Sequence, residues 1–307
     1  MDKLKIGLIY GGASPEHEVS ISTAKSIREN IDRDRFDVVD IFIDKDGKLN
    51  ENLLDNIDVA FLAVHGPNCE DGKLQQYLED RKIKYTGSGV KASQINMDKI
   101  LMHDAFKAAG LPVVEYKGFD KNNIDHIKNY VEEIDCPVFI KPNNGGSSIG
   151  MTKVDSIDDL EKAIQEAFKF DDKIIVEKAV VKPREIELAV LGNNDLIISE
   201  PGEINYQEEF YDYNAKYFNQ DTSVLFDTLD ENMNKKIKEM TSKAYLGTGC
   251  KGYARVDFLI DKNENIFINE INTLPGCTAT SMFPKLMAKS GIGYKELISR
   301  IINLALE

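Results

Sequence analysis

Two neighbouring stretches near the C-terminus alternate polar with apolar residues at a period of two. They run from Tyr253 to Ile260 and from Phe267 to Asn272. This period is typical of strands that bury one face and expose the other. The segment between them, Asp261-Lys-Asn-Glu-Asn265, has the residue types of a turn. The pattern therefore predicts an antiparallel hairpin, the local feature that most limits how this chain can fold.

The register of this hairpin determines which polar side chains meet. A turn centred on residues 263–264 places Asp257 opposite Glu270 and Arg255 opposite Asn272. Two carboxylates that face each other repel unless a cation lies between them. Aspartate, glutamate and an amide oxygen form an all-oxygen ligand set, which suits Mg²⁺ or Mn²⁺ and disfavours zinc. A single carboxylate would more simply belong to a solvated sheet face, but the set of four favours a metal-assisted phosphate site.

Length and charge limit the classes of function. A chain of 307 residues is too long for one ordinary core, so two or three domains are expected. The formal net charge of −14 argues against nucleic acid or an anionic membrane as the main partner. The four cysteines form no CxxC pair, which is typical of reduced thiols, and no apolar run approaches the length of a membrane span. We therefore expect a soluble, cytoplasmic protein.

The N-terminal part alternates strands with helices, which predicts an α/β fold with a largely parallel sheet. A strand from Leu4 to Tyr10 runs into Gly11-Gly12 and then into a helix, with Ser14 expected as its N-cap and Pro15 as its first residue. Glu16 and Glu18 could simply complement the positive end of this helix. However, ligands of such sheets bind at the carboxyl ends of the strands. Glu18 and His65 both follow strand ends, so they are candidate site residues.

A lysine and a glycine-rich loop in the middle of the chain suggest phosphate binding. The predicted strand 137–141 ends in Lys141 and is followed by Asn143-Asn-Gly-Gly-Ser-Ser-Ile-Gly150. Exposed N–H groups and hydroxyls in such a loop suit the covering of phosphates, although an ordinary hairpin loop would look similar. Further along, Glu185 and Glu187 share one face of a strand, which is either solvated or lines a cleft.

The periodic pattern stops between Glu203 and Leu225. A loop of this length inside a domain is usually functional or disordered, and its aromatic residues favour an ordered lid. Helices are expected before and after the hairpin, at 231–246, 281–290 and 294–306.

Together these motifs resemble the ATP-grasp superfamily, and most closely the D-alanine–D-alanine ligase family, from residue 4 to about residue 300. The resemblance rests on six motifs, namely Gly11-Gly-Ala-Ser-Pro-Glu-His-Glu-Val-Ser20, His65-Gly-Pro-Asn-Cys-Glu-Asp-Gly72, Met97-Asp-Lys99, Lys141-Pro142 with Gly146-Ser-Ser148, Tyr211-Asp-Tyr-Asn-Ala-Lys-Tyr217, and Glu270-Ile-Asn-Thr-Leu-Pro-Gly276. It implies three domains: an N-terminal α/β substrate domain (1–95), and two α+β domains (96–180 and 181–307) that clasp ATP.

The resemblance also implies a role for each candidate residue. The nucleotide would be bound by Lys99, Lys141, Ser148, Glu177, Glu185 and Lys216, and two Mg²⁺ or Mn²⁺ ions by Asp257, Glu270 and Asn272. The catalytic set would be Glu18, Ser147, Tyr217, Arg255 and Gly276, with Glu18 binding the first substrate's ammonium group. His65, Ser281 and Met282 would bind substrate. Cys69 and Asn214 depart from the family's usual residues, which concerns specificity more than reaction type.

The implied activity is ATP-dependent formation of D-alanyl-D-alanine through an acyl phosphate, in peptidoglycan precursor synthesis, by a homodimer. Two alternatives stay open within the class, a D-alanine–D-lactate and a D-alanine–D-serine ligase. An alternative from another class is a nucleotide-binding regulatory module that has lost catalysis.

Overall fold

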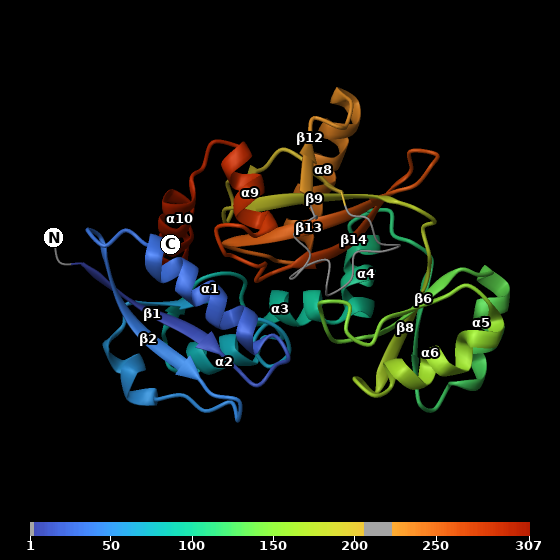
Figure 1. Ribbon diagram of the computed structural model, residues 1–307, viewed down its shortest axis with the longest axis horizontal. Helices are drawn as coiled ribbons and strands as arrows, with labels where there is room; N and C mark the ends of the chain where they lie inside the picture. Colours follow the sequence, from blue (N-terminus) through green and yellow to red (C-terminus); the bar gives the residue numbers. More distant parts are fainter. Residues whose placement is uncertain (1–2, 206–222) are drawn as a thin grey trace.

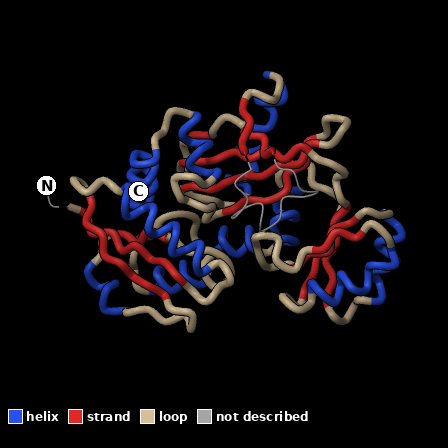
Figure 2. The backbone as a smooth tube through the Cα atoms, viewed as in Figure 1, coloured by secondary structure: helices blue, strands red, loops and turns tan. Residues whose placement is uncertain are grey.

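The computed structural model describes residues 3–205 and 223–307, and three sheets divide them into three units that lie in a row (Figures 1 and 2). The N-terminal sheet is parallel, in the order β2-β1-β3-β4. Its strands are β1 (Leu4–Gly11), β2 (Phe36–Ile43), β3 (Val59–Leu62) and β4 (Lys84–Tyr85). Helices α1 (His17–Asn30), α2 (Lys73–Asp80) and α3 (Val90–Met97) accompany it. β3 is buried along its whole length, as expected for a strand covered on both faces.

The central unit is a four-stranded antiparallel sheet in the order β5-β8-β6-β7. Its strands are β5 (Tyr116–Asp120), β6 (Val138–Pro142), β7 (Thr152–Val154) and β8 (Lys173–Lys178). The helices α5 (Asp125–Ile134) and α6 (Leu160–Ala167) pack against it, and their apolar residues form one core with Ile140 and Val176. The glycine-rich loop lies between β6 and β7.

The third unit is a six-stranded antiparallel sheet in the order β12-β11-β9-β13-β14, with β10 paired to β9. It contains β9 (Arg184–Leu191), β10 (Ile197–Ile198), β11 (Gly202–Asn205), β12 (Ser223–Phe226), β13 (Tyr253–Ile260) and β14 (Ile266–Asn272). The associated helices are α4 (Lys99–Ala108), α8 (Glu231–Gly247), α9 (Met282–Lys289) and α10 (Tyr294–Leu306). The predicted fold class, a parallel N-terminal sheet followed by two α+β units, is confirmed.

The predicted hairpin is β13 and β14, and its register at the site is confirmed. Asp257 pairs with Glu270 and Arg255 with Asn272. The turn is not where we expected it, because the strand ends Ile260 and Ile266 pair with each other. A bulge after Asp257 gives β14 one extra residue and restores the expected register beyond it.

Two helices pack on a sheet that is distant from them in the chain. Ile298 and Ile302 of α10 join the core of the N-terminal sheet, and Lys84 donates to the carbonyl of Leu306. In Figure 1 the red C-terminal helix accordingly lies beside the blue N-terminal unit. Met102 and Phe106 of α4 join the core of the C-terminal sheet. The domain boundaries at residues 95 and 180 stay a prediction, but packing does not follow the order of the chain.

The start of α1 differs from the prediction. The helix begins at His17, and Ser14 is not its N-cap. The Ser14 hydroxyl instead donates to the carbonyl of His65 and accepts from the N–H of Glu16. The two preceding glycines have φ angles of 96° and 104°, which other residues rarely adopt, so this strand-to-helix turn depends on glycine.

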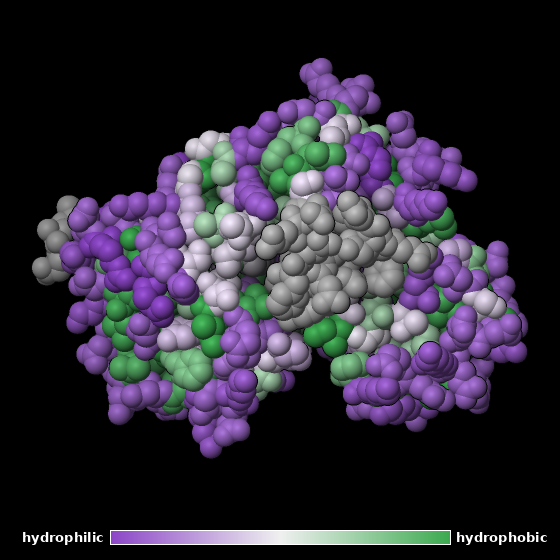
Figure 3. All heavy atoms as spheres, viewed as in Figure 1, coloured by the Kyte–Doolittle hydropathy of each residue, from purple (hydrophilic) through white to green (hydrophobic). Residues whose placement is uncertain are grey.

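The predicted lid segment is also corrected at its ends. Residues 202–205 and 223–226 are the paired strands β11 and β12, not loop. The residues between them, including Lys216 and Tyr217, lie outside the described residues. Among residues 3–205 and 223–307, no helix combines the length and the apolar character needed to cross a membrane. On the face drawn in Figure 3, hydrophobic residues show only as patches among hydrophilic ones.

Candidate active site

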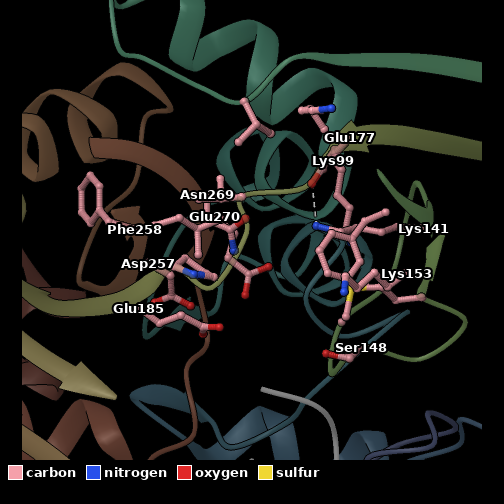
Figure 4. A pocket seen from close by; sticks show the side chains of 18 of the residues that line it. Lys99, Lys141, Ser148, Lys153, Glu177, Glu185, Asp257, Phe258, Asn269 and Glu270 are labelled. Atoms are coloured by element: carbon pink, nitrogen blue, oxygen red, sulfur yellow. Dashed lines mark hydrogen bonds and ion pairs between the residues drawn. The ribbon is translucent and has the colours of Figure 1, made fainter. Parts of the chain in front are cut away.

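A pocket lies between the two antiparallel sheets, and most of the predicted nucleotide-binding residues line it. The central unit contributes Lys141 from β6, Glu177 from β8 and the glycine-rich loop, and the C-terminal unit contributes Glu185 from β9. The pocket is also lined by Lys99, Ser147, Ser148, Glu187, Asp257 and Glu270. Figure 4 shows Glu185, Asp257 and Glu270 on one side of it and Lys141, Lys153 and Ser148 on the other. The strand face with Glu185 and Glu187 therefore lines a cleft.

The acidic side of the pocket has the donor set expected for a hard cation. The Asn272 amide lies 3.2 Å from Asp257 Oδ2 and 3.4 Å from Glu270 Oε1, so the three side chains converge. Rotating this amide by half a turn would present its oxygen in place of its nitrogen. Among the described residues no three His, Cys, Asp or Glu side chains form a metal cluster, so the set consists of two carboxylates and one amide. These oxygen donors fit Mg²⁺ or Mn²⁺.

Arg255 lies against this acidic set. Its guanidinium donates to Asp257 Oδ1 at 2.7 Å and to Oδ2 at 2.6 Å, and lies 3.1 Å from Glu187 Oε2. Burial would lower the pKa of Arg255, but the charges of Asp257 and Glu187 raise it well above its ordinary value. Arg255 therefore stays cationic and is held in a fixed orientation.

The basic side of the pocket contains a buried ion-pair network. Lys141 Nζ lies 2.6 Å from Glu177 Oε2, and His103 Nε2 lies 3.1 Å from Glu177 Oε1. Burial alone would raise the pKa of Glu177, but Lys141 and His103 reverse this and lower it. Glu177 thus lines the pocket as predicted, while its carboxylate is engaged by these two residues. Its expected contact with the nucleotide stays a prediction.

The glycine-rich loop is held in an unusual conformation. Ser147 and Ser148 have φ angles of 53° and 59°, in the left-handed region that costs most residues free energy. The Lys99 ammonium donates to the carbonyl of Gly145. The Ser147 hydroxyl donates to Glu16 Oε1 at 2.6 Å. The loop is therefore tied both to α4 and to the start of α1 in the N-terminal unit.

Glu16, and not Glu18, is the glutamate that faces the site. Glu16 is buried beside Ser147, whereas the Glu18 side chain is 79% exposed and lies 3.8 Å from Lys45. Successive helical residues point in different directions, so residues two apart cannot share a face. Glu18 therefore points away from Ser147, and Glu16 is the glutamate that lies beside it. Which residue anchors the first substrate stays a prediction, and the geometry favours Glu16.

His65 lies in a small buried cluster next to Glu16. Its Nε2 is 3.1 Å from the Thr23 hydroxyl and its Nδ1 is 3.5 Å from Glu70 Oε1. Burial would lower the pKa of His65, but Glu70 and Glu16 raise it. Burial raises the pKa of Glu70, which His65 partly offsets. This cluster can exchange or share a proton at the carboxyl end of β3.

The predicted contacts of the second substrate lie together on the loop after β14. A side chain added at Gly276 would meet Ser281 Oγ at 3.2 Å, so these two residues are neighbours. Ser281 precedes α9, and Met282 is its buried first residue.

Glu16 and His103 were not among the predicted site residues, although their helical spacing from other residues pointed to them. The buried residues of α1 include Ser20, Thr23 and Ile27, and Glu16 lies four residues before Ser20 on that same face. His103 lies four residues after Lys99 in α4, a spacing that places both on one side of the helix.

Comparison with known proteins agrees over the whole chain. A family model described as D-ala D-ala ligase C-terminus matches residues 105–303, and one described as D-ala D-ala ligase N-terminus matches residues 5–55 and 47–88. A D-alanine–D-alanine ligase of Caldicellulosiruptor bescii is 39% identical, over 100% of this chain and 96% of that protein.

Two solved structures share the fold. The VanG D-Ala:D-Ser ligase of Enterococcus faecalis has a TM-score of 0.89 and 31% identity, covering 99% of this chain and 100% of that one. The D-alanine–D-alanine ligase of Bacillus anthracis, solved in complex with ATP, has a TM-score of 0.86 and 30% identity, covering 100% of this chain and 98% of that one.

Proposed function

Because the chain belongs to the D-alanine–D-alanine ligase family of ATP-grasp enzymes, we propose that it joins two D-alanine molecules into D-alanyl-D-alanine for peptidoglycan precursor synthesis, converting ATP to ADP and phosphate. One observation carries this proposal. The hydrogen bond between Ser147 and Glu16 joins the loop over the nucleotide pocket to the N-terminal unit. This link supports the proposal that a substrate bound at Glu16 lies next to the phosphates of ATP.

In the proposed first step, a carboxylate oxygen of the first D-alanine takes the terminal phosphoryl group of ATP. This gives an acyl phosphate, whose carbonyl carbon is a far better electrophile than that of a carboxylate. Glu16 binds the ammonium group of this substrate. Lys99 and Lys141 bind the phosphates, and their positive charges stabilise the charge on the group in transfer.

In the proposed second step, the amine of the second D-alanine attacks the acyl phosphate and phosphate leaves. Ser281 holds the carboxylate of the incoming molecule. The Arg255 guanidinium and the Gly276 N–H stabilise the oxyanion that forms at the attacked carbon. Arg255 suits this role because its two carboxylate partners already hold it in place. Lys216 and Tyr217, also assigned to this site, lie outside the described residues.

Asp257, Glu270 and Asn272 are the residues proposed to hold Mg²⁺ or Mn²⁺, one ion or two. When bound, such an ion would neutralise negative charge on the phosphate groups. The support is the convergence of their oxygen donors beside the pocket.

The second candidate function is a D-alanine–D-serine ligase, because the VanG ligase has the same fold over the whole chain. D-Lactate as the second substrate is a third possibility. Incubation with ATP, Mg²⁺ and an equimolar mixture of D-alanine, D-serine and D-lactate, followed by mass spectrometry of the products, decides among them. D-Alanyl-D-alanine should dominate, and a dominant mixed product would reassign the second substrate. Absence of ADP formation with D-alanine would instead favour the non-catalytic regulatory module.

A homodimer and a cytoplasmic location complete the proposal, and both rest on the family resemblance. Light scattering of the purified protein would test the dimer, since a single species of 34.5 kDa would contradict it. Cell fractionation would test the location.

A further inference from the structure

The loop that follows β14 is held by a chain of hydrogen bonds that no step of the proposed reaction uses. The N–H of Ala279 donates to Ser26 Oγ at 3.1 Å, and Ser26 Oγ lies 3.1 Å from the Tyr294 hydroxyl. The Tyr294 hydroxyl donates to the carbonyl of Cys277. Ser26 lies in α1 of the N-terminal unit and Tyr294 is the first residue of α10.

The direction of this chain follows from its two ends. The Cys277 carbonyl can only accept, so the one hydroxyl proton of Tyr294 goes there. The Ser26 oxygen accepts from the Ala279 N–H, and its own proton is then donated to the Tyr294 oxygen. Every proton of the chain has an acceptor, and such a satisfied, partly buried network orders the groups that it joins.

The chain ends on the two residues on either side of Thr278, which in turn holds Ser281. The N–H of Thr278 donates to Ser281 Oγ at 3.1 Å, and its hydroxyl lies 2.7 Å from the same oxygen. Ser281 Oγ itself lies next to Gly276. Through Thr278, Ser26 and Tyr294 are thus connected to Ser281, the proposed contact for the carboxylate of the second substrate.

We propose that Ser26 and Tyr294 are positioning residues for the second substrate, a D-amino acid bound through its carboxylate at Ser281. They hold the loop between Gly276 and Ser281 in the shape that receives this molecule. The inference rests on the proposed function of that loop, and it adds that α1 and α10 control how well the incoming amino acid binds.

The test compares Tyr294→Phe and Ser26→Ala with wild type. Initial rates over a wide range of D-alanine concentrations resolve the two substrate-binding steps, and ADP affinity is measured separately by calorimetry. Loss of one such hydrogen bond should raise the KM of the second D-alanine by about 3- to 10-fold. ADP affinity and the KM of the first D-alanine should stay within about twofold. In the double variant the KM of the second D-alanine should rise by less than the product of the two single increases, because both residues act through the same series of hydrogen bonds.

Two controls separate positioning from general loss of stability. Tyr245→Phe removes another buried tyrosine hydroxyl, which donates to the carbonyl of Gly192 at 2.8 Å in the same unit, and should leave the second KM unchanged. Ser26→Thr keeps a hydroxyl and should behave like wild type.

Each failure points to a different premise. If wild type makes no dipeptide, the proposed function fails. If wild type is active but the second KM of Tyr294→Phe is unchanged, or rises while ADP affinity falls by a similar factor, the positioning role is wrong.

Discussion

At the level of single residues, the start of α1 offers two glutamates that differ only in direction. Glu16 accepts the hydrogen bond of Ser147, and Glu18 reaches the exposed Lys45. The two side chains point to different faces of the helix, because each successive residue is rotated by about 100° around the helix axis. Glu16 lies on the helix face that also carries the buried Ser20 and Thr23, which is why the proposed substrate-binding role is assigned to it.

Replacing Glu16 with glutamine should weaken binding of the first D-alanine. A charge-assisted hydrogen bond contributes about 1.5–3 kcal/mol, so kcat/KM should fall roughly 10- to 100-fold. Glu18→Gln is the matched control, and its surface position predicts a change within about twofold. Steady-state kinetics over a range of D-alanine concentrations checks both variants. A larger loss in Glu18→Gln than in Glu16→Gln would reverse the assignment.

Glu270→Gln should abolish most activity and leave the fold intact. The change replaces a charged metal ligand by a neutral one of nearly the same shape. The same strand already contains an amide side chain at Asn272, so the fold should tolerate a second one. Turnover should drop, and the stabilisation that Mg²⁺ with ADP gives in thermal unfolding should shrink, while Tm without ligands stays close to wild type. Normal turnover at ordinary Mg²⁺ would remove Glu270 from the metal set.

At the level of elements, the network of Lys141, Glu177 and His103 connects β6, β8 and α4. All three side chains are largely buried. The arrangement holds Lys141, the lysine proposed to bind phosphate, in a fixed position. It also makes the contact between the central unit and α4 depend on charge, since α4 packs its other face on the C-terminal core.

The lowered pKa of Glu177 predicts a specific pH dependence. In the folded state the pKa lies below its ordinary value of 4.5, so the unfolded chain binds the proton more tightly. This contribution to stability is therefore complete above about pH 4.5 and is lost as the pH falls toward the folded pKa. Urea unfolding of wild type between pH 3 and pH 7 should show this loss, and Glu177→Gln should lack that part of the slope.

At pH 7, Glu177→Gln should also cost about 3–5 kcal/mol, because Lys141 would be left as an uncompensated buried cation. Glu166→Gln breaks an exposed ion pair with Lys169 and should cost at most about 1 kcal/mol. An equal loss in the free energy of unfolding for the two variants would show that the buried network stabilises the fold no more than an exposed ion pair does.

At the level of the whole molecule, the C-terminal helix closes the structure by packing on the N-terminal sheet. Ile298, Ile301 and Ile302 of α10 are buried in one core with Ile6 and Phe61. The two ends of the chain thus stabilise each other. Hydrogen bonds of Ser26 and Tyr294 also join α1 and α10 to the loop after β14.

Truncating Ile298 to alanine should therefore destabilise a sheet that is more than 200 residues away in sequence. A large-to-small change at a fully buried site costs about 2–5 kcal/mol. Hydrogen exchange should become faster in β1 and β3. Ile237→Ala, equally buried but in the core of the C-terminal sheet, is the control and should speed exchange in β9 and β13 first. Unchanged protection of β1 in Ile298→Ala would contradict this mutual support.

The sequence by itself determined most elements, the fold class and the hairpin that carries Asp257 and Glu270. These follow from local periodicity, turn residues and pairing geometry, which depend on neighbours in the chain. The position of Lys141 and of the glycine-rich loop after a strand was also predicted, because both directly follow an apolar strand pattern.

Only the tertiary structure decided which glutamate contacts Ser147, which partners engage the carboxylate of Glu177, and where α4 and α10 pack. The direction of Glu16 depends on where α1 begins, and that is set by the bond from Ser14 to His65, a residue 51 positions away. The partners of Glu177 come from α4 and β6. α10 is amphipathic wherever it lies, and its sequence contains no record of which apolar surface it covers. Such choices depend on contacts between distant segments, which a local pattern does not encode.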